Sequence, residues 1–107
     1  MVSRSITFSI AAQQKLLQGY ASSRGFIIEK EFIDVETAKA SGRASFTEMV
    51  NYIKKHPAIR TVLVEKTDRL YRNLKDWVLL DELQIEIHLV KEGVVLSEDS
   101  KSTEKFF

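Results

Sequence analysis

The spacing of hydrophobic positions changes along the chain, and each change marks a predicted element. Apolar positions three and four residues apart predict a helix over 9–24, with Ser9 as its N-cap and Gly25 as its left-handed C-cap. An S-x-x-E capping box at Ser45 precedes an amphipathic run and starts a second helix. A third helix is predicted over 74–83.

Four other segments have the composition of strands, being short and rich in β-branched or aromatic residues. They are 26–35, 61–64 (the continuous run TVLV, typical of a buried parallel strand), 85–89 and, after a tight turn, 94–96. Alternation of helices and strands predicts an α/β fold with a mainly parallel central sheet flanked by helices, formed as one domain over residues 1–107.

Composition excludes several classes of protein. The chain has 107 residues, of which 44 % are hydrophobic and 29 % charged, as in a soluble globular domain. It has no Cys, its two His are far apart, and its four Gly form no nucleotide-binding motif, so no metal or nucleotide cofactor is expected. No apolar run is long enough for a membrane span and no secretory signal is visible, which predicts a cytoplasmic protein without a membrane partner.

The net charge of +1 hides an uneven distribution. Seven basic residues and two acidic ones lie in 54–75, whereas six acidic residues and one Lys lie in 81–99. These two regions are either solvated faces or, for the basic one, a surface for a polyanion such as DNA.

Two predicted loops carry arginines at the carboxyl ends of strands, where ligands bind in parallel sheets. Asp68, Arg69 and Arg72 lie just before the third helix, and Arg43 lies just before the second. A helix N-terminus disfavours each cation by about 0.3–1 kcal/mol. Either Asp68 therefore pairs with an arginine, or an anion such as phosphate lies between the arginines and the helix N-terminus.

Three arginines and one carboxylate suit phosphoryl transfer. Negative charge builds on the non-bridging oxygens in its transition state, and guanidinium groups hold that charge. The nucleophile would then be a side-chain hydroxyl or water, and composition does not choose among the many Ser and Thr.

Four segments resemble the catalytic domain of serine recombinases, the resolvase/invertase family, and especially those of phages and mobile elements. They are VEKTDRLYRN (64–73), DVETAK with SGR (34–43), SIAAQ (9–13) and IHLVKEGVVLSEDSKS (87–102). The resemblance covers 9–107, its most specific motif is D-R-L-x-R-N, and it implies a three-layer resolvase-like fold.

The resemblance implies site-specific DNA recombination. A serine attacks a DNA phosphodiester and becomes linked to the 5′ end as phosphoserine. Two dimers join as a tetramer, strands are exchanged and the 3′ hydroxyls reseal them, without metal or nucleotide. By the same resemblance Arg43, Arg69 and Arg72 would hold the scissile phosphate, Asp68 would orient them or help proton transfer, and Gln13 would lie near the site.

The chain departs from the family pattern at its start. Family members begin with an interior strand that ends in Y-x-R-x-S, which supplies a phosphate ligand and the nucleophile. Here the chain starts Met-Val-Ser-Arg-Ser, and no Tyr-x-Arg precedes a serine. Either Val2-Ser3 matches the end of the motif, which makes Ser3 the expected nucleophile, or the motif is absent. The place of the strand would be filled by Ser5–Phe8 or by a partner chain.

The chain also stops near the start of the long helix that leads family members to their DNA-binding domain, so the sequence resembles a fragment. Its function is then recombination by the catalytic domain, or that of an inactive remnant acting as an interaction module. A receiver-like signalling domain using Asp34 or Asp68 is disfavoured by the surrounding arginines.

His88, on the polar face of its strand, and Trp77 are expected to be structural, and Tyr71 either packs or touches DNA.

Overall fold

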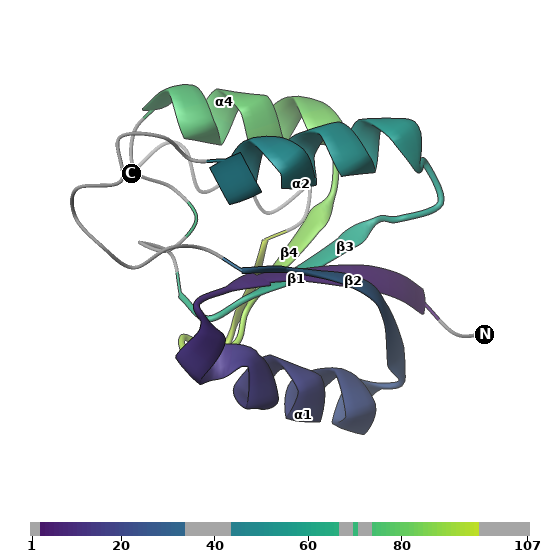
Figure 1. Cartoon of the computed structure of the whole chain (residues 1–107), viewed down its shortest axis with the longest axis vertical. Helices are drawn as coiled ribbons and strands as arrows, with labels where there is room; N and C mark the ends of the chain where they lie inside the picture. Colours follow the sequence, from purple (N-terminus) through teal and green to yellow (C-terminus); the bar gives the residue numbers. More distant parts are fainter. Residues whose placement is uncertain (1–2, 34–43, 67–69, 71–73, 97–107) are drawn as a thin grey trace.

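Five strands and the helices on both their faces form three layers (Figure 1). The computed structural model describes residues 3–33, 44–66, 70 and 74–96. The elements are β1 (Ser3–Ser9), a 3-10 helix (Ala11–Gln13), α1 (Gln14–Arg24), β2 (Phe26–Ile33), α2 (Ala44–Lys55), β3 (Thr61–Val64), α4 (Leu74–Leu83), β4 (Glu86–Leu89) and β5 (Val94–Leu96).

The sheet has the strand order β2-β1-β3-β4-β5. The first four strands are parallel, and β5 pairs antiparallel with β4. In Figure 1, α1 covers one face of the sheet, and α2 and α4 cover the other. The predicted α/β fold with a mainly parallel central sheet flanked by helices is confirmed.

Strand β1 occupies the interior of the sheet, between β2 and β3. The sequence left open whether Ser5–Phe8 or a partner chain fills this position. Ser5–Phe8 fills it, as part of a strand that runs from Ser3 to Ser9. The prediction of Ser9 as a helix N-cap is wrong, because Ser9 ends the strand and Ile10 precedes the 3-10 helix without a side-chain cap. The S-I-T-F-S run alternates with a period of two, which is the period of a strand. It forms a strand and not a helix because it pairs with β2 on one side and with β3 on the other.

One face of β1 supplies the centre of the main core. Ile6 and Phe8 are fully buried in a cluster that also contains Phe32 and residues of α2 and α4. The rings of Phe8 and Phe46 meet edge to face, with centroids 5.9 Å apart and planes at 78°. Burying side chains of this size contributes about 1.5–3 kcal/mol each to stability, so β1 anchors the α2–α4 layer.

The other face of β1 is made of hydroxyl groups. Ser5, Thr7 and Ser9 are all buried, and alternation along the strand directs them away from Ile6 and Phe8, towards α1. The Ser5 hydroxyl donates to the Ile27 carbonyl at 3.0 Å. The apolar core on this side is small, with three buried residues: Leu17, Ala21 and Leu63.

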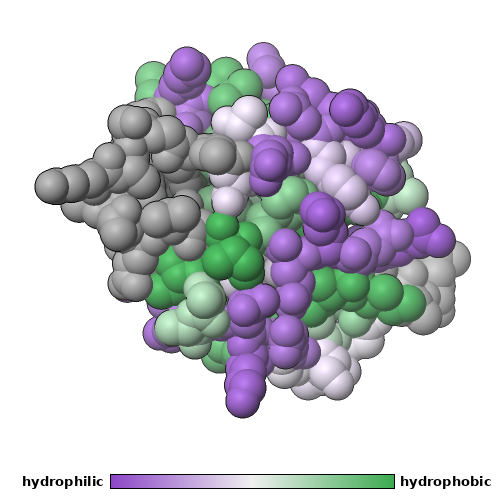
Figure 2. Space-filling view, viewed as in Figure 1, coloured by the Kyte–Doolittle hydropathy of each residue, from purple (hydrophilic) through white to green (hydrophobic). Residues whose placement is uncertain are grey.

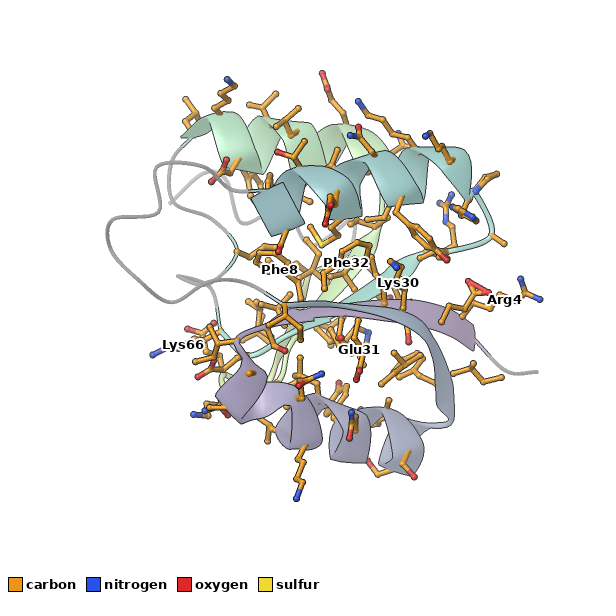
Figure 3. The ribbon with its side chains drawn as sticks, viewed as in Figure 1. Arg4, Phe8, Lys30, Glu31, Phe32 and Lys66 are labelled. Atoms are coloured by element: carbon orange, nitrogen blue, oxygen red, sulfur yellow. The ribbon has the colours of Figure 1, made fainter. Side chains whose placement is uncertain are left out.

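A β-bulge interrupts the edge strand β2. Ser5 pairs with Ile28 and Ile6 pairs with Lys30, so Glu29 has no partner of its own on β1. After the bulge Phe32 faces the core beside Phe8, and Glu31 faces α1 (Figure 3). The side-chain amides of Gln14 and Gln18 donate to the Glu31 carboxylate at 3.2 and 2.8 Å, which ties α1 to β2.

The exposed edge of β2 is polar in its middle. Glu29, Lys30 and Glu31 lie between the exposed side chains of Ile27 and Ile33. Figure 2 faces this edge and shows hydrophilic groups separating the hydrophobic patches. A bulge and charged side chains both disfavour pairing with a strand of another chain.

The ends of two helices test the predicted caps. Gly25 adopts the left-handed conformation (φ 76°) as the C-cap of α1, as predicted. The capping box at Ser45 is wrong, because α2 already begins at Ala44. The Ser45 hydroxyl instead donates to the carbonyl of Ile33 at 2.5 Å and fastens the start of α2 to the end of β2.

His88 lies on the polar face of β4, which it shares with Glu86, and it is buried there against α1. Its Nδ1 is hydrogen-bonded to the Tyr20 hydroxyl at 2.6 Å, and its Nε2 lies 2.7 Å from Glu86 Oε1. The rings of Tyr20 and Phe26 both meet the imidazole edge to face. These contacts join α1, β2 and β4, as expected for a structural histidine.

Replacing Phe8 tests the interior position of β1. We expect Phe8→Ala to lower the free energy of unfolding by about 3–5 kcal/mol, because it leaves a cavity in the main core. Val94→Ala, at a half-exposed position of β5, is the control and should cost less than about 1 kcal/mol. Urea denaturation followed by circular dichroism measures both. A loss below 1 kcal/mol for Phe8→Ala would place β1 outside the core.

The Tyr20–His88 hydrogen bond predicts a non-additive pair of substitutions. Tyr20→Phe should cost about 1–3 kcal/mol, because it leaves the buried imidazole nitrogen without its partner. The double variant Tyr20→Phe/His88→Leu should be less destabilised than the two single variants predict by addition, since it removes both polar groups. Thermal and urea unfolding of the four proteins give the coupling energy. Strict additivity would mean that the hydrogen bond contributes nothing.

Candidate active site

The carboxyl ends of four parallel strands define one edge of the sheet. Strands β2, β1, β3 and β4 end at Ile33, Ser9, Val64 and Leu89. Ligands of open α/β sheets bind beyond this edge. We call it the carboxyl edge, and the opposite one the amino edge.

Four of the predicted site residues lie outside the described residues: Arg43, Asp68, Arg69 and Arg72. Tyr71 and Asp34 lie outside them as well. The described chain stops at the end of β2 and resumes at the start of α2, and the described residues next to the Asp-Arg motif are Lys66 and Leu70. Arg43, Asp68, Arg69 and Arg72 remain predictions of the sequence.

The structure separates the other two predicted residues. Ser3 begins β1 and pairs with Phe26, the first residue of β2, so it lies at the amino edge. Gln13 ends the 3-10 helix that follows β1, and its backbone N–H donates to the Ile10 carbonyl at 2.9 Å, so it lies at the carboxyl edge. The two residues are separated by the whole of β1, about 20 Å of extended strand. Figure 3 shows this separation through two neighbours, with Arg4 at one end of the sheet and Lys66 at the other.

Ser9 is the serine that the strand brings to the carboxyl edge. It is the last residue of the interior strand and is 0 % exposed. Its hydroxyl, like that of Thr7, has no hydrogen-bond partner among the described residues. A buried hydroxyl without a partner is costly, by about 1–3 kcal/mol, and is therefore a candidate for a functional role. The period-two run S-I-T-F-S is the sequence pattern that predicts a strand ending at Ser9.

A buried carboxylate also follows β3 at the carboxyl edge. Glu65 is the first residue after β3 and is 3 % exposed. Its Oε2 forms an ion pair with Lys91 Nζ at 3.2 Å, and its carbonyl accepts a hydrogen bond from the Lys91 N–H at 2.9 Å. Glu65 is not among the site residues that the sequence predicts, because it precedes the Asp-Arg motif by three residues.

A separate groove of 290 Å³ lies between β2 and α2. Its lining includes Lys30, Phe32, Tyr52 and Lys55. Lys30 Nζ lies 5.6 Å from the centroid of the Phe32 ring and 5.9 Å from that of Tyr52, which is cation–π geometry. The ammonium is therefore held by the groove's own aromatic rings, and the carboxyl edge is the better candidate for chemistry.

Within the described ranges, no cluster of three or more His, Asp or Glu side chains is arranged to hold a metal ion. No helix in the same ranges has the length and apolar character to cross a membrane.

Comparison with known proteins identifies the fold and the family. The family model for the resolvase N-terminal domain matches residues 2–107. The N-terminal catalytic domain of TP901-1 integrase superposes with a TM-score of 0.73 at 25 % sequence identity, covering 98 % of this chain and 88 % of that one. No curated protein sequence matches the chain.

A second solved structure shares the fold alone. The C-terminal catalytic domain of ISC1926 TnpA, an IS607-like serine recombinase, superposes with a TM-score of 0.64 at 17 % identity, covering 81 % of this chain and 67 % of that one. The five-stranded, mainly parallel sheet with α1, α2 and α4 thus corresponds to the serine recombinase catalytic domain. Since the family model spans nearly every residue, the chain belongs to the resolvase N-terminal-domain family.

Proposed function

We propose that this domain carries out DNA cleavage and rejoining in site-specific recombination, with Ser9 as the nucleophile. The proposal rests on one observation: Ser9 is the serine at the carboxyl end of the interior strand, with a buried hydroxyl that has no hydrogen-bond partner among the described residues. The family of the chain supports recombination in general. DNA is then the substrate, the working form is a dimer or tetramer, and the cytoplasm is the expected location.

Position favours Ser9 over Ser3. The arginine-bearing segments follow β2 and β3 in sequence, and both strands end at the carboxyl edge. Ser9 ends the strand between them, whereas Ser3 is at the amino edge. An attacking oxygen and the groups that hold the phosphate must lie within about 3–3.5 Å of the same phosphate, which a residue at the opposite edge cannot achieve.

The other assignments form one site with Ser9. Arg43, Arg69 and Arg72 hold the scissile phosphate and stabilise its transition state, and Asp68 orients the arginines. Gln13, which follows Ser9 by four residues at the same edge, contributes its side-chain amide near the phosphate. In the family motif Y-x-R-x-S, an arginine two residues before the serine supplies a further phosphate ligand. In this chain Thr7 occupies that position and has no positive charge. We therefore expect slow cleavage by this chain.

Covalent trapping tests the nucleophile. The chain is incubated with nicked duplexes whose bases around the nick are randomised, and protein–DNA adducts are separated on a denaturing gel and located by tandem mass spectrometry. We expect an adduct at Ser9 that Ser9→Ala abolishes and that Ser3→Ala and Ser5→Ala retain. An adduct that survives in Ser9→Ala would assign the nucleophile elsewhere. No adduct with any serine intact would identify the chain as an inactive remnant.

Anion binding tests the arginines. Arg69→Ala and Arg72→Ala should each weaken the binding of inorganic sulfate about 10-fold or more, because a hydrogen bond to a charged group contributes about 1.5–3 kcal/mol. Both variants should keep the circular dichroism spectrum and melting temperature of the wild type. Arg4→Ala, at the amino edge, is the matched control and should leave sulfate binding unchanged. Titration followed by NMR chemical shifts measures the affinity; unfolding of the Arg69 or Arg72 variant would show a structural role instead.

A further inference from the structure

The groove between β2 and α2 is a feature that the proposed mechanism does not use. It has a volume of 290 Å³, and its lining comes from these two elements: Lys30, Phe32, Glu48, Asn51, Tyr52 and Lys55. Two ammonium groups, one amide and one phenol hydroxyl can donate hydrogen bonds into it, and a single carboxylate accepts them. A lining so rich in donors suits an anionic ligand.

Lys30 is held in this groove without losing its charge. It pairs with the core residue Ile6 in the sheet register, so its side chain points to the α2 side of the sheet (Figure 3). Its Nζ lies 5.6 Å from the ring centroid of Phe32 and 5.9 Å from that of Tyr52. An aromatic ring attracts an ammonium through its quadrupole, whereas a carboxylate would cancel its charge. The rings therefore position the cation and leave its net charge for a ligand.

The aromatic wall of the groove is itself fixed in place. The Tyr52 ring meets Phe32 edge to face, with centroids 5.7 Å apart and planes at 69°. It also stacks on the His56 ring, with centroids 4.0 Å apart and planes at 17°. His56 Nδ1 is in turn hydrogen-bonded to the Tyr52 carbonyl at 2.8 Å. The groove is therefore largely preformed, which lowers the entropy cost of binding a ligand.

Positive charge exceeds negative charge around this groove. Glu48 is exposed in its lining, yet no ion pair joins it to Lys30 or Lys55 among the described residues. Lys54, exposed on the same last turn of α2, adds a third ammonium. Lys54 and Lys55 also begin the basic region of the sequence at 54–75. A ligand with several negative charges in a row complements this arrangement.

We propose that the groove binds a backbone phosphate of DNA. Lys30 and Lys55 pair with the phosphate oxygens. The amide of Asn51 and the hydroxyl of Tyr52 donate to the phosphate or the sugar, contacts that position DNA without reading its sequence. The identity of the anion as DNA rests on the function proposed above, because that function supplies a polyanion as substrate.

The direction of α2 gives the groove its place relative to the cleaved phosphate. The Ser45 hydroxyl bonds to the carbonyl of Ile33, so α2 starts at the carboxyl edge. Lys55, the last residue of α2, lies about 16 Å from its first residue, Ala44. That length corresponds to about five base pairs of duplex. The groove thus contacts DNA beside the cleavage site and not at the scissile phosphate.

The salt dependence of DNA binding tests this site. The whole chain is titrated into a short fluorescent duplex of arbitrary sequence, and anisotropy gives the affinity at several salt concentrations. We expect Lys30→Gln and Lys55→Gln each to reduce the slope of log affinity against log salt by about one, and to weaken binding about 10-fold at about 0.1 M salt. Glu48→Gln, which removes a negative charge from the same groove, should strengthen binding. Lys15→Gln, at an exposed position of α1 on the other face of the sheet, is the matched control and should change neither quantity.

NMR locates the contact and separates DNA from a protein ligand. The duplex should shift the ring resonances of Tyr52. A poly-glutamate peptide that shifts them at a lower concentration than the duplex would assign the groove to an acidic protein segment and overturn the proposal. An unchanged slope in both lysine variants, an equal loss in Lys15→Gln, or no binding by the wild type would also overturn it. Binding is measured without cleavage, so a missing Ser9 adduct contradicts the proposed nucleophile alone.

Discussion

Both helical layers of this domain depend on one strand that must satisfy two different environments. On one face, β1 contributes Ile6 and Phe8 to the main core under α2 and α4. On the other, it presents three hydroxyl groups to α1. A strand in the interior of a parallel sheet is ordinarily apolar on both faces. The departure in β1 limits the apolar area that the strand offers to α1, so hydrogen bonds add to the apolar contacts that attach this helix.

Those hydrogen bonds come from residues spread along α1. Gln14 and Gln18 hold Glu31 of β2, and Tyr20, two residues after Gln18, holds His88 of β4. Together they fix the rotation of α1 over the sheet and hence the place of the short helix that carries Gln13. These contacts act together with the apolar cluster of Leu17, Ala21 and Leu63, against which Tyr20, Phe26, Ile28 and Val90 also pack.

The sequence predicts most of the fold because its patterns are local. The TVLV run, the left-handed Gly25 and the turn before β5 each depend on neighbouring residues, and each agrees with the structure. Predictions that depended on the start of the chain were less successful. Ser9 has the residue type of an N-cap, and only pairing with both β2 and β3 makes it the end of a strand. The arginine site comes from motif likeness and lies outside the described residues.

The bulge in β2 has a consequence for how the sheet tolerates change in length. Glu29 is the one residue of β2 without a partner on β1, so it alone separates two stretches of opposite phase. Deleting it would make the pairs Ser5–Ile28 and Ile6–Lys30 consecutive in a regular ladder, with Phe32 still beside Phe8 and Glu31 still facing α1. The edge strand can therefore lose this residue without turning a paired side chain to the other face of the sheet.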